Sequence, residues 1–260
     1  MLTLNCNRGR AADNATDCAG RQAEFLLSQA QAGRIDVAGL QLVSEAQVRD
    51  VTAAIGEGWQ YQFAEAAAPF GNALLSRFPI TATKSIPLPS EDLEARTLLV
   101  CTIDIPRETA SNRLAVGVCH LENTQEHVRF AQLGKVLEEM NDVPDHVLLG
   151  DFNALRVDDY SAAQWASLCE FAAHAGWEKR QEACYQLMMQ HKYRDAWEEV
   201  SSSTGCGDRT TFRCAPVAMM LRIDYIFAAP RCRLRFSGCQ VLREEQLSNH
   251  LPLLVWGHYG

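Results

Sequence analysis

Short apolar runs alternate along the chain with longer amphipathic stretches, and clusters of Gly, Pro, Asn and Asp separate them. This pattern predicts strands at residues 2–6, 35–43, 60–64, 73–77, 96–105, 113–121, 147–150, 210–214, 222–228, 233–242 and 251–256. It predicts helices at residues 16–31, 44–55 and 124–140, and over much of residues 161–192. Thr16 and Ser44 are expected to cap the first two helices, and Gly33 to end the first one.

The order of these elements mixes hairpin-length links with helical crossovers. Such an order favours mixed sheets covered by helices, and hence a layered α/β sandwich. The chain of 260 residues is long enough for one large domain with a substantial core. Residues 201–205 have a flexible composition but are too few for a domain linker. We therefore expect a single domain over residues 1–260.

The composition narrows the classes of function. The 24 Lys and Arg residues against 32 Asp and Glu residues give a net charge of −8, which disfavours strong non-specific binding to duplex DNA. No apolar run approaches the ~20 residues that span a bilayer. The first residues become polar too early for a secretory signal, so we expect an intracellular protein. Ten cysteines without a Cys-x-x-Cys pair indicate reduced, packed thiols and disfavour a zinc site.

The most informative stretch is Gly150-Asp151-Phe152-Asn153, which directly follows an apolar run at residues 147–149. Here a buried strand is expected to end in a turn. Asp151 and Asn153 stand two residues apart, so they project on the same side of an extended segment. Their oxygens suit Mg²⁺ or Mn²⁺. A plain strand exit is the alternative, because Gly, Asp and Asn are ordinary turn residues.

Further polar residues lie where other predicted strands begin or end. They are Asn5, His120, Asp224, Asn249 and His250. Each has a purely structural alternative. A histidine such as His120 often lies in a protein core with its hydrogen bonds satisfied there. Asp224 suits a fixed ion pair with Arg222. Asn249 suits a cap on the next segment. Spacing along the chain does not prove that these side chains converge.

A series of segments, in order along nearly the whole chain, resembles the endonuclease/exonuclease/phosphatase superfamily. That superfamily includes deoxyribonucleases, abasic-site endonucleases, deadenylases, inositol-polyphosphate 5-phosphatases and tyrosyl-DNA phosphodiesterases. The segments are residues 2–5, 36–41, 71–80, 96, 120–121, 129–132, 150–153, 222–227 and 248–252. The resemblance implies a four-layer α/β sandwich in which two mixed β-sheets pack face to face, flanked by helices.

The resemblance also implies a mechanism. A divalent ion, Mg²⁺ or Mn²⁺, would act on the phosphoryl oxygen while a water attacks. His250, oriented by Asp224, would be the base or stabilise the transition state. His120 would contact the scissile phosphate, Asp151 would hold the water or the metal, and Asn153 would position the phosphate. The implied metal ligands are Asn5, Asp151 and Asn249, and the implied substrate contacts are Asn72, Arg96 and Arg222.

Two carboxylates of the family pattern are missing. Leu42 stands where the family usually has a metal-binding Glu, and Asn249 stands where it usually has an Asp. Leucine cannot bind a metal, and an amide oxygen binds Mg²⁺ more weakly than a carboxylate does. Glu45 and Glu122 are the nearby acids that could replace the lost ligand if the chain turned back.

Two hypotheses follow. The first is a metal-dependent hydrolase of phosphodiesters or phosphate esters, with nucleic acid as the expected partner and a monomer as the expected state. The second is a weak or inactive relative that binds a phosphorylated ligand or a protein. Residues 156–194 form a long insert that suits a substrate-selecting element. The insert contains Trp165 and Trp177, and Trp197 follows it. For all three tryptophans we expect packing within a helix or the core, with stacking on nucleic-acid bases as the alternative.

Overall fold

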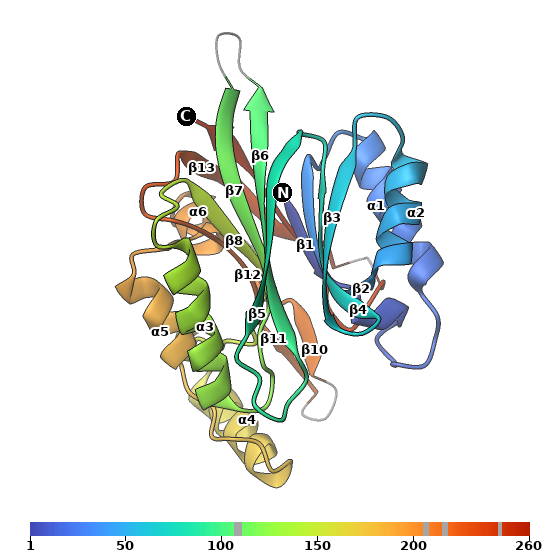
Figure 1. The fold of residues 1–260 in the computed structure, drawn as a ribbon. Coiled ribbons are helices and arrows are strands. Elements are labelled where there is room, and N and C mark those ends of the chain that lie inside the picture. Colours follow the sequence, from blue (N-terminus) through green and yellow to red (C-terminus); the bar gives the residue numbers. More distant parts are fainter. Residues whose placement is uncertain (107–110, 205–207, 215–217, 244–245) are drawn as a thin grey trace.

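Two six-stranded β-sheets pack face to face in the computed structural model, and helices cover their outer faces (Figure 1). The structure describes residues 1–106, 111–204, 208–214, 218–243 and 246–260. Both sheets are mixed, because each contains one parallel pair of strands among antiparallel ones. This arrangement confirms the predicted α/β sandwich with two mixed sheets flanked by helices.

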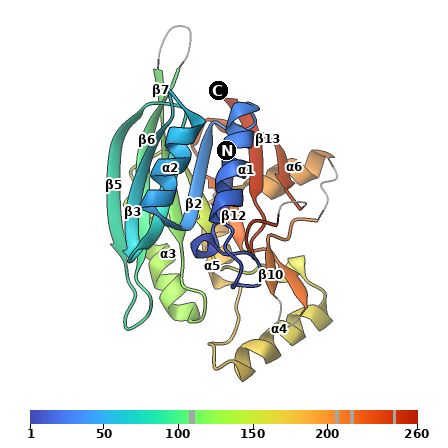
Figure 2. The same cartoon turned by 90° about the vertical axis from the view of Figure 1, so that its right-hand side faces the viewer.

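The first sheet has the strand order β13-β14-β1-β2-β4-β3. Its strands are β1 (Leu2–Asn5), β2 (Val37–Ser44), β3 (Gln60–Ala67), β4 (Phe70–Ser76), β13 (Leu234–Val241) and β14 (Leu253–Tyr259). Helices α1 (Ala19–Gln31) and α2 (Glu45–Ile55) cover its outer face (Figures 1 and 2). Phe25, Leu26 and Val48 of these helices pack on Leu4 and Leu40 of the sheet.

The second sheet has the strand order β5-β6-β7-β8-β12-β9. Its strands are β5 (Ile80–Leu88), β6 (Arg96–Pro106), β7 (Ser111–His120), β8 (His146–Asp151), β9 (Arg194–Asp195) and β12 (Asp224–Ala228). Helices α3 (Glu126–Met140), α5 (Ala183–Gln190) and α6 (Ala196–Thr204) lie on its outer side (Figure 1). The short 3₁₀ helices are η1 (Asn7–Gly9) and η2 (Val157–Asp159).

Helix α4 (Ala162–His174) and a hairpin of β10 (Phe212–Cys214) and β11 (Met219–Leu221) lie beyond one end of the sheets. Both views show them side by side at this end (Figures 1 and 2). Leu168 of the helix packs there with Cys214 and Leu221 of the hairpin. The helix and the hairpin therefore form a small apolar unit next to the strand ends.

The two sheets approach closely at Gly39 of β2. A Cβ atom at this position would lie 1.9 Å from Cδ1 of Leu149 and 3.3 Å from Cγ2 of Val118 in the facing sheet. Both facing side chains are fully buried. The absence of a side chain at Gly39 therefore allows the two sheets to approach this closely.

Several local predictions are confirmed and others are wrong. Ser44 caps α2 in a capping box with Gln47, as predicted. Helix α1 starts later than predicted, at Ala19, because the Thr16 hydroxyl donates instead to the Asp13 carboxylate. The sequence did not indicate β5 or α6. Strand β5 is an edge strand with a largely exposed centre, so it lacks the apolar alternation that identifies a strand.

No helix among the described residues combines the length and the apolar character that a membrane span requires. The nine cysteines within the described part of the chain are all free thiols, and eight of them are buried. Burial raises the pKa of the Cys6 and Cys101 thiols to about 12. These cysteines therefore pack as small apolar side chains.

Replacing Gly39 tests the contact between the sheets. Gly39→Ala is expected to lower the free energy of unfolding by about 1–3 kcal/mol, because the new methyl group overpacks the core against Leu149. Gly134→Ala is the matched control, since a Cβ there meets no atom within 4 Å and lies within α3. The control should gain roughly 0.5–1 kcal/mol of stability. Urea denaturation measures both, and equal stability of the two variants would contradict the prediction.

Candidate active site

The register of the second sheet places three predicted site residues side by side. His120, the last residue of β7, is the partner of Asp151, the last residue of β8. Asp224, the first residue of β12, is the antiparallel partner of Asp151 on its other side. All three side chains are buried. Parallel strands that end together and an antiparallel strand that begins there bring these groups to one edge of the sheet.

The turn after β8 depends on two unusual backbone conformations. Gly150 has φ 141°, and a Cβ atom there would lie 2.0 Å from the Cys119 carbonyl oxygen. Asn153 has φ 48°, in the left-handed region that Asn tolerates better than most residues. Its backbone N–H donates to Oδ1 of Asp151 at 3.0 Å, and its side-chain amide donates to the Leu121 carbonyl at 3.0 Å. These contacts fix Asp151 and Asn153 relative to each other.

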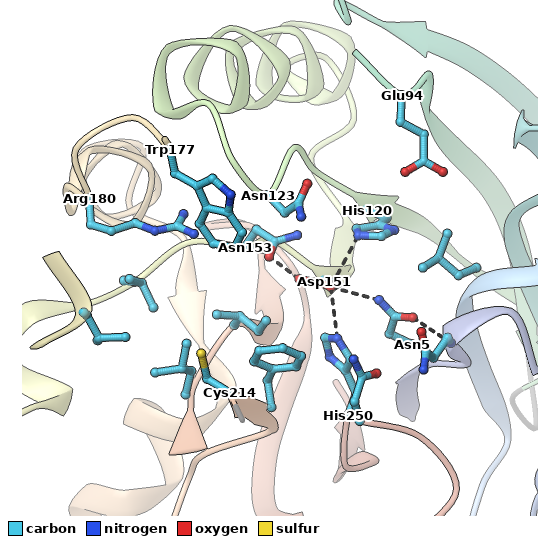
Figure 3. Close-up of a pocket in the computed structure, with 18 of the residues that line it drawn as sticks. Asn5, Glu94, His120, Asn123, Asp151, Asn153, Trp177, Arg180, Cys214 and His250 are labelled. Atoms are coloured by element: carbon cyan, nitrogen blue, oxygen red, sulfur yellow. Dashed lines mark hydrogen bonds and ion pairs between the residues drawn. The ribbon is translucent and has the colours of Figure 1, made fainter. Parts of the chain in front are cut away.

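Two further residues, Asn5 and His250, complete this group of polar side chains (Figure 3). Asn5 comes from the first sheet, and His250 comes from the loop that leads into β14. Asn5 ends β1, and its Nδ2 donates to Oδ2 of Asp151 at 2.9 Å. His250 precedes β14, and its Nδ1 lies 2.9 Å from Oδ2 of Asp224. The other ring nitrogen of His250, Nε2, lies 3.6 Å from Oδ2 of Asp151. The predicted contact between Asp224 and His250 is therefore present.

Burial and charge shift the pKa values of Asp151 and His250 together. Burial, and then the charge of Asp224, raise the pKa of Asp151 to about 6. Burial lowers the pKa of His250, but the charges of Asp224 and Asp151 outweigh it, so this pKa rises above its ordinary value. The His250 imidazolium is thus stabilised between two carboxylates.

His120 is a neutral imidazole. Burial, and then the charges of Arg96 and His250, lower its pKa well below its ordinary value. Nη1 of Arg96 lies 3.2 Å from Nδ1 of His120. Because the guanidinium can only donate, Nδ1 accepts and Nε2 carries the proton. That Nε2 lies 3.4 Å from Oδ2 of Asp151 and faces the same cavity.

These groups line a cavity of about 340 Å³. The predicted site residues that line it are Asn5, Arg96, His120, Asp151, Asn153, Asn249 and His250. Asp224 is not among them, because it lies behind the His250 ring, to which it is hydrogen-bonded. The sequence did not single out the lining residues Asn7, Glu94, Asn123, Arg180 and Phe212. Of these, Asn7 offered a signal because it stands two residues after Asn5, and Asn123 offered one because it stands three residues after His120.

Two predicted substrate contacts lie elsewhere. Arg222 does not line the cavity, because its Nη2 lies 2.6 Å from both carboxylate oxygens of the buried Asp195. Its guanidinium also lies over the Tyr225 ring, 4.5 Å from the centroid. Asn72 is buried next to the cavity and donates to the Thr97 carbonyl at 2.6 Å. Both side chains thus support the framework around the site.

The acids near the missing family carboxylate do not occupy its place. Leu42 itself lines the cavity, at a β-bulge where its φ is 50°. Glu45 is exposed at the start of α2, and Glu122 is buried against Thr124, so neither lines the cavity. Glu94 lines it instead, but Arg8 holds its carboxylate at 2.6 Å. Leu42 therefore leaves an apolar side chain at the position where the family pattern has a metal-binding Glu.

Comparison with known proteins identifies the family. The model of the Endonuclease/Exonuclease/phosphatase family matches residues 2–246. The chain belongs to this family. No curated protein matches the chain in sequence at a significant level.

Several solved structures have the same fold at low sequence identity. The mannosyl-6-phosphatase of Bacteroides thetaiotaomicron is 17% identical with a TM-score of 0.73, over 99% of this chain and 98% of that one. A humanized D. rerio TDP2 is 18% identical with a TM-score of 0.69, over 99% and 97%. The human Nocturnin catalytic domain is 17% identical with a TM-score of 0.69, over 100% and 93%. At these identities the likeness establishes the fold.

The family is associated with divalent metals, and the donor atoms of this chain fit one. Donor atoms of Asp151, Asp224 and His250 lie within 4.8 Å of one another. Among the described residues, no Lys or Arg lies within ion-pair distance of Asp151, whose Oδ2 lies 3.4 Å from Nε2 of His120 and 3.6 Å from Nε2 of His250. A buried carboxylate with a raised pKa and no Lys or Arg partner is suited to binding a cation from solution.

The raised pKa of Asp151 predicts how metal affinity depends on pH. A metal must displace the proton from a carboxylate whose pKa is about 6. We expect the dissociation constant for Mn²⁺ to weaken at least about tenfold between pH 7 and pH 5 and to change little above pH 7. Asp151→Asn should remove most of the affinity, while the exposed control Asp142→Asn should bind as the parent does. Calorimetric titration tests this, and a pH-independent affinity would contradict it.

Proposed function

We propose that this protein is a divalent-metal-dependent hydrolase of phosphoesters that uses Mg²⁺ or Mn²⁺. The observation that carries the proposal is an oriented imidazole next to a buried carboxylate in a cavity. His250 is held by Asp224 at 2.9 Å, and its other nitrogen faces Asp151 at 3.6 Å. Family membership supports the same class of chemistry.

Asp151 is the proposed principal metal ligand, and Asn5 and Asn249, which also line the cavity, are the proposed neutral ligands. When bound, the ion supplies Lewis-acid stabilisation of the charge that develops on a phosphoryl oxygen. Asn5 orients the Asp151 carboxylate through its 2.9 Å hydrogen bond. Asn153 fixes the other oxygen of the same carboxylate through its backbone N–H.

His250 is proposed to hold or move a proton at Nε2. Its Nδ1 contact with Asp224 fixes the orientation of the ring and favours the imidazolium. His120 offers a neutral Nε2–H donor to a phosphate oxygen, because Arg96 donates to its Nδ1. A second hydrogen on the Asn153 amide remains for the same phosphate. These donors would stabilise the charge of a pentacovalent phosphorus.

The donor set of the proposed metal site is poor in charge. Leu42 and Asn249 stand at two positions where carboxylates are expected. We expect weak Mg²⁺ binding and a preference for Mn²⁺, which accepts nitrogen and neutral oxygen ligands more readily. The same two residues support the second candidate function, a phosphoester-binding protein with little or no turnover.

The substrate class stays a prediction. Nucleic acid was the expectation from the sequence, whereas one of the structural neighbours is a mannosyl-6-phosphatase. Phosphodiesters and phosphate monoesters therefore both belong in the first screen. A monomeric, intracellular protein with one domain is likewise predicted.

The role of His250 can be tested directly. The parent protein with Mn²⁺ is expected to hydrolyse at least one member of a panel of abasic DNA, single-stranded nucleic acid, phosphotyrosyl DNA, phosphoinositides and sugar phosphates. His250→Ala should lower the rate by roughly 10²–10⁴-fold, because the oriented proton carrier is lost. His258→Ala is the matched control, since His258 is exposed on β14. Parent activity that survives in His250→Ala would place the chemistry elsewhere.

Restoring the two missing carboxylates separates an active enzyme from a binding protein. Leu42→Glu with Asn249→Asp should tighten metal binding by roughly 10–100-fold and raise phosphoester hydrolysis with it. Leu42 lies half-exposed in the cavity wall, so a glutamate there stays in contact with solvent. Its positive φ strains Leu and Glu alike, since both carry a Cβ atom.

The control for this variant adds the same charge outside the cavity, as Asn141→Asp with Gln190→Glu at two exposed sites. It should leave metal affinity and activity unchanged. A folded Leu42→Glu, Asn249→Asp protein that binds metal tightly but hydrolyses nothing would favour the binding function.

A further inference from the structure

One half of the cavity is apolar, although its other half carries the polar groups described above. The apolar half is a wall of side chains from the segment after β8, helix α4, the stretch after it and the β10–β11 hairpin (Figure 3). We call it the apolar wall; its main members are Leu155, Leu168, Phe171, Trp177, Phe212 and Ile223. Cavities that bind organic ligands are mostly apolar with a few placed polar groups, as here.

The insert that the sequence indicated as a substrate-selecting element supplies three members of the wall, Leu168, Phe171 and Trp177. Leu168 and Leu155 pack with Cys214 and Leu221 of the hairpin, which fixes α4 against it. The chain then returns toward the site after α4. The Glu178 N–H donates to the Thr124 carbonyl at 3.1 Å, and this tie holds the insert near the end of β7. The wall is therefore a fixed part of the cavity.

Trp177 is the largest member of the wall, and its neighbours hold its ring in place. Phe171 packs edge-on against it, with ring centroids 5.4 Å apart and an interplanar angle of 74°. The Arg180 guanidinium lies over the indole, 4.7 Å from its centroid. The indole is half-exposed and borders the cavity next to Asn123 and Asn153 (Figure 3). An aromatic plane is thus presented close to the proposed phosphate position.

Arg180 adds a charge to this half of the cavity. Among the described residues, no carboxylate lies within ion-pair distance of its guanidinium, whose close contact is the Trp177 ring. Burial, and then the charge of Arg129, lower the pKa of Arg180 to about 10, so it stays protonated at neutral pH. The cation favours entry of a negatively charged phosphoester into a protein of net charge −8.

The wall reaches the reacting end of the cavity. The ring centroids of Phe212 and His250 lie 4.7 Å apart, at an interplanar angle of 49°. A phosphate held near His250 and Asn153 would therefore place its organic group against aromatic and aliphatic side chains. Exposure of the apolar wall to water is unfavourable in free energy. A flat ring suits this wall, because aromatic rings stack on one another.

We infer that the substrate is a phosphoester whose organic group carries a flat aromatic ring, and that this ring lies on the apolar wall next to Trp177. The inference rests on the proposed function, whose substrate class it names. A nucleobase and an aryl alcohol both supply such a ring. Trp177 is here a specificity-determining residue, because it touches the organic group and leaves the proton transfers to other residues.

Four phosphonates, which cannot be hydrolysed at the ester position, test this by calorimetric titration of the parent protein with saturating Mn²⁺. Methylphosphonate has no ring, and 2-naphthylmethylphosphonate has a flat one. Its fully saturated decahydro analogue has the same carbon skeleton without the flat shape. The phosphonate analogue of adenosine 5′-monophosphate carries a nucleobase.

At least one of the two ring-bearing ligands is expected to bind roughly 10–100-fold tighter than methylphosphonate. The naphthyl compound should bind at least about threefold tighter than its saturated analogue if the ring is an aryl group. Tight binding of the adenosine analogue alone would assign the ring to a nucleobase. Ring-bearing ligands that bind no tighter than methylphosphonate would overturn the inference.

Trp177→Ala should reduce the preference for the ring to less than about threefold, while Trp256→Ala, at an exposed tryptophan of β14, should keep it. Trp177→Leu, which keeps apolar volume but removes the plane, should behave like the alanine variant. A full preference for the ring in both Trp177 variants would overturn the inference. Because the titration measures binding, a protein that binds the ring and hydrolyses nothing contradicts the proposed function alone.

Discussion

The buried carboxylate of Asp151 is the group around which the site is arranged. It lies at the edge of the second sheet, between His120 and Asp224 on neighbouring strands. Asn5 of the other sheet reaches it across the sandwich at 2.9 Å. A buried charge without such partners would be strongly unfavourable. The packing of the two sheets therefore also positions the chemical groups, and Gly39, which permits that packing, serves the site from a distance.

The hydrogen bond between Asp224 and His250 orients the imidazole ring relative to the Asp151 carboxylate. Asp224 holds Nδ1 of the ring, so that Nε2 faces Asp151 and the cavity. His120 lies on the other side of Asp151 and stays neutral, because burial, and then the charge of Arg96, lower its pKa. One histidine is therefore favoured as a cation and the other as a neutral donor. Two chemically identical side chains gain different roles from their neighbours.

At Leu42, a single side chain replaces an expected metal ligand with an apolar surface. Leu42 lies at the β-bulge of β2, and its side chain lines the cavity together with Glu94, Arg96 and His120. The backbone conformation is that of a residue aimed at the site, while the side chain offers no ligand. Together with the apolar wall, Leu42 gives the cavity a largely apolar lining around its polar groups.

Sequence motifs and periodicity determined the elements and the polar residues at strand ends. The apolar run before Gly150 and the capping box of Ser44 act within a few residues, so local sequence determines them. The contact of Asp224 with His250 followed from resemblance to a family. Strand β5 was missed, because an exposed edge strand has no apolar face to reveal it.

Only the tertiary structure decided whether the long side chains of Arg222 and Trp177 lie in the cavity or elsewhere. Arg222 pairs with Asp195, which is 27 residues away, and this removes it from the cavity. Trp177 could equally have packed in a core, as the buried Trp197 does. Its place in the cavity wall depends on the tie between Glu178 and Thr124 and on the packing of α4 against the hairpin. Such contacts join segments far apart in the chain, and local propensity carries no record of which segments will meet.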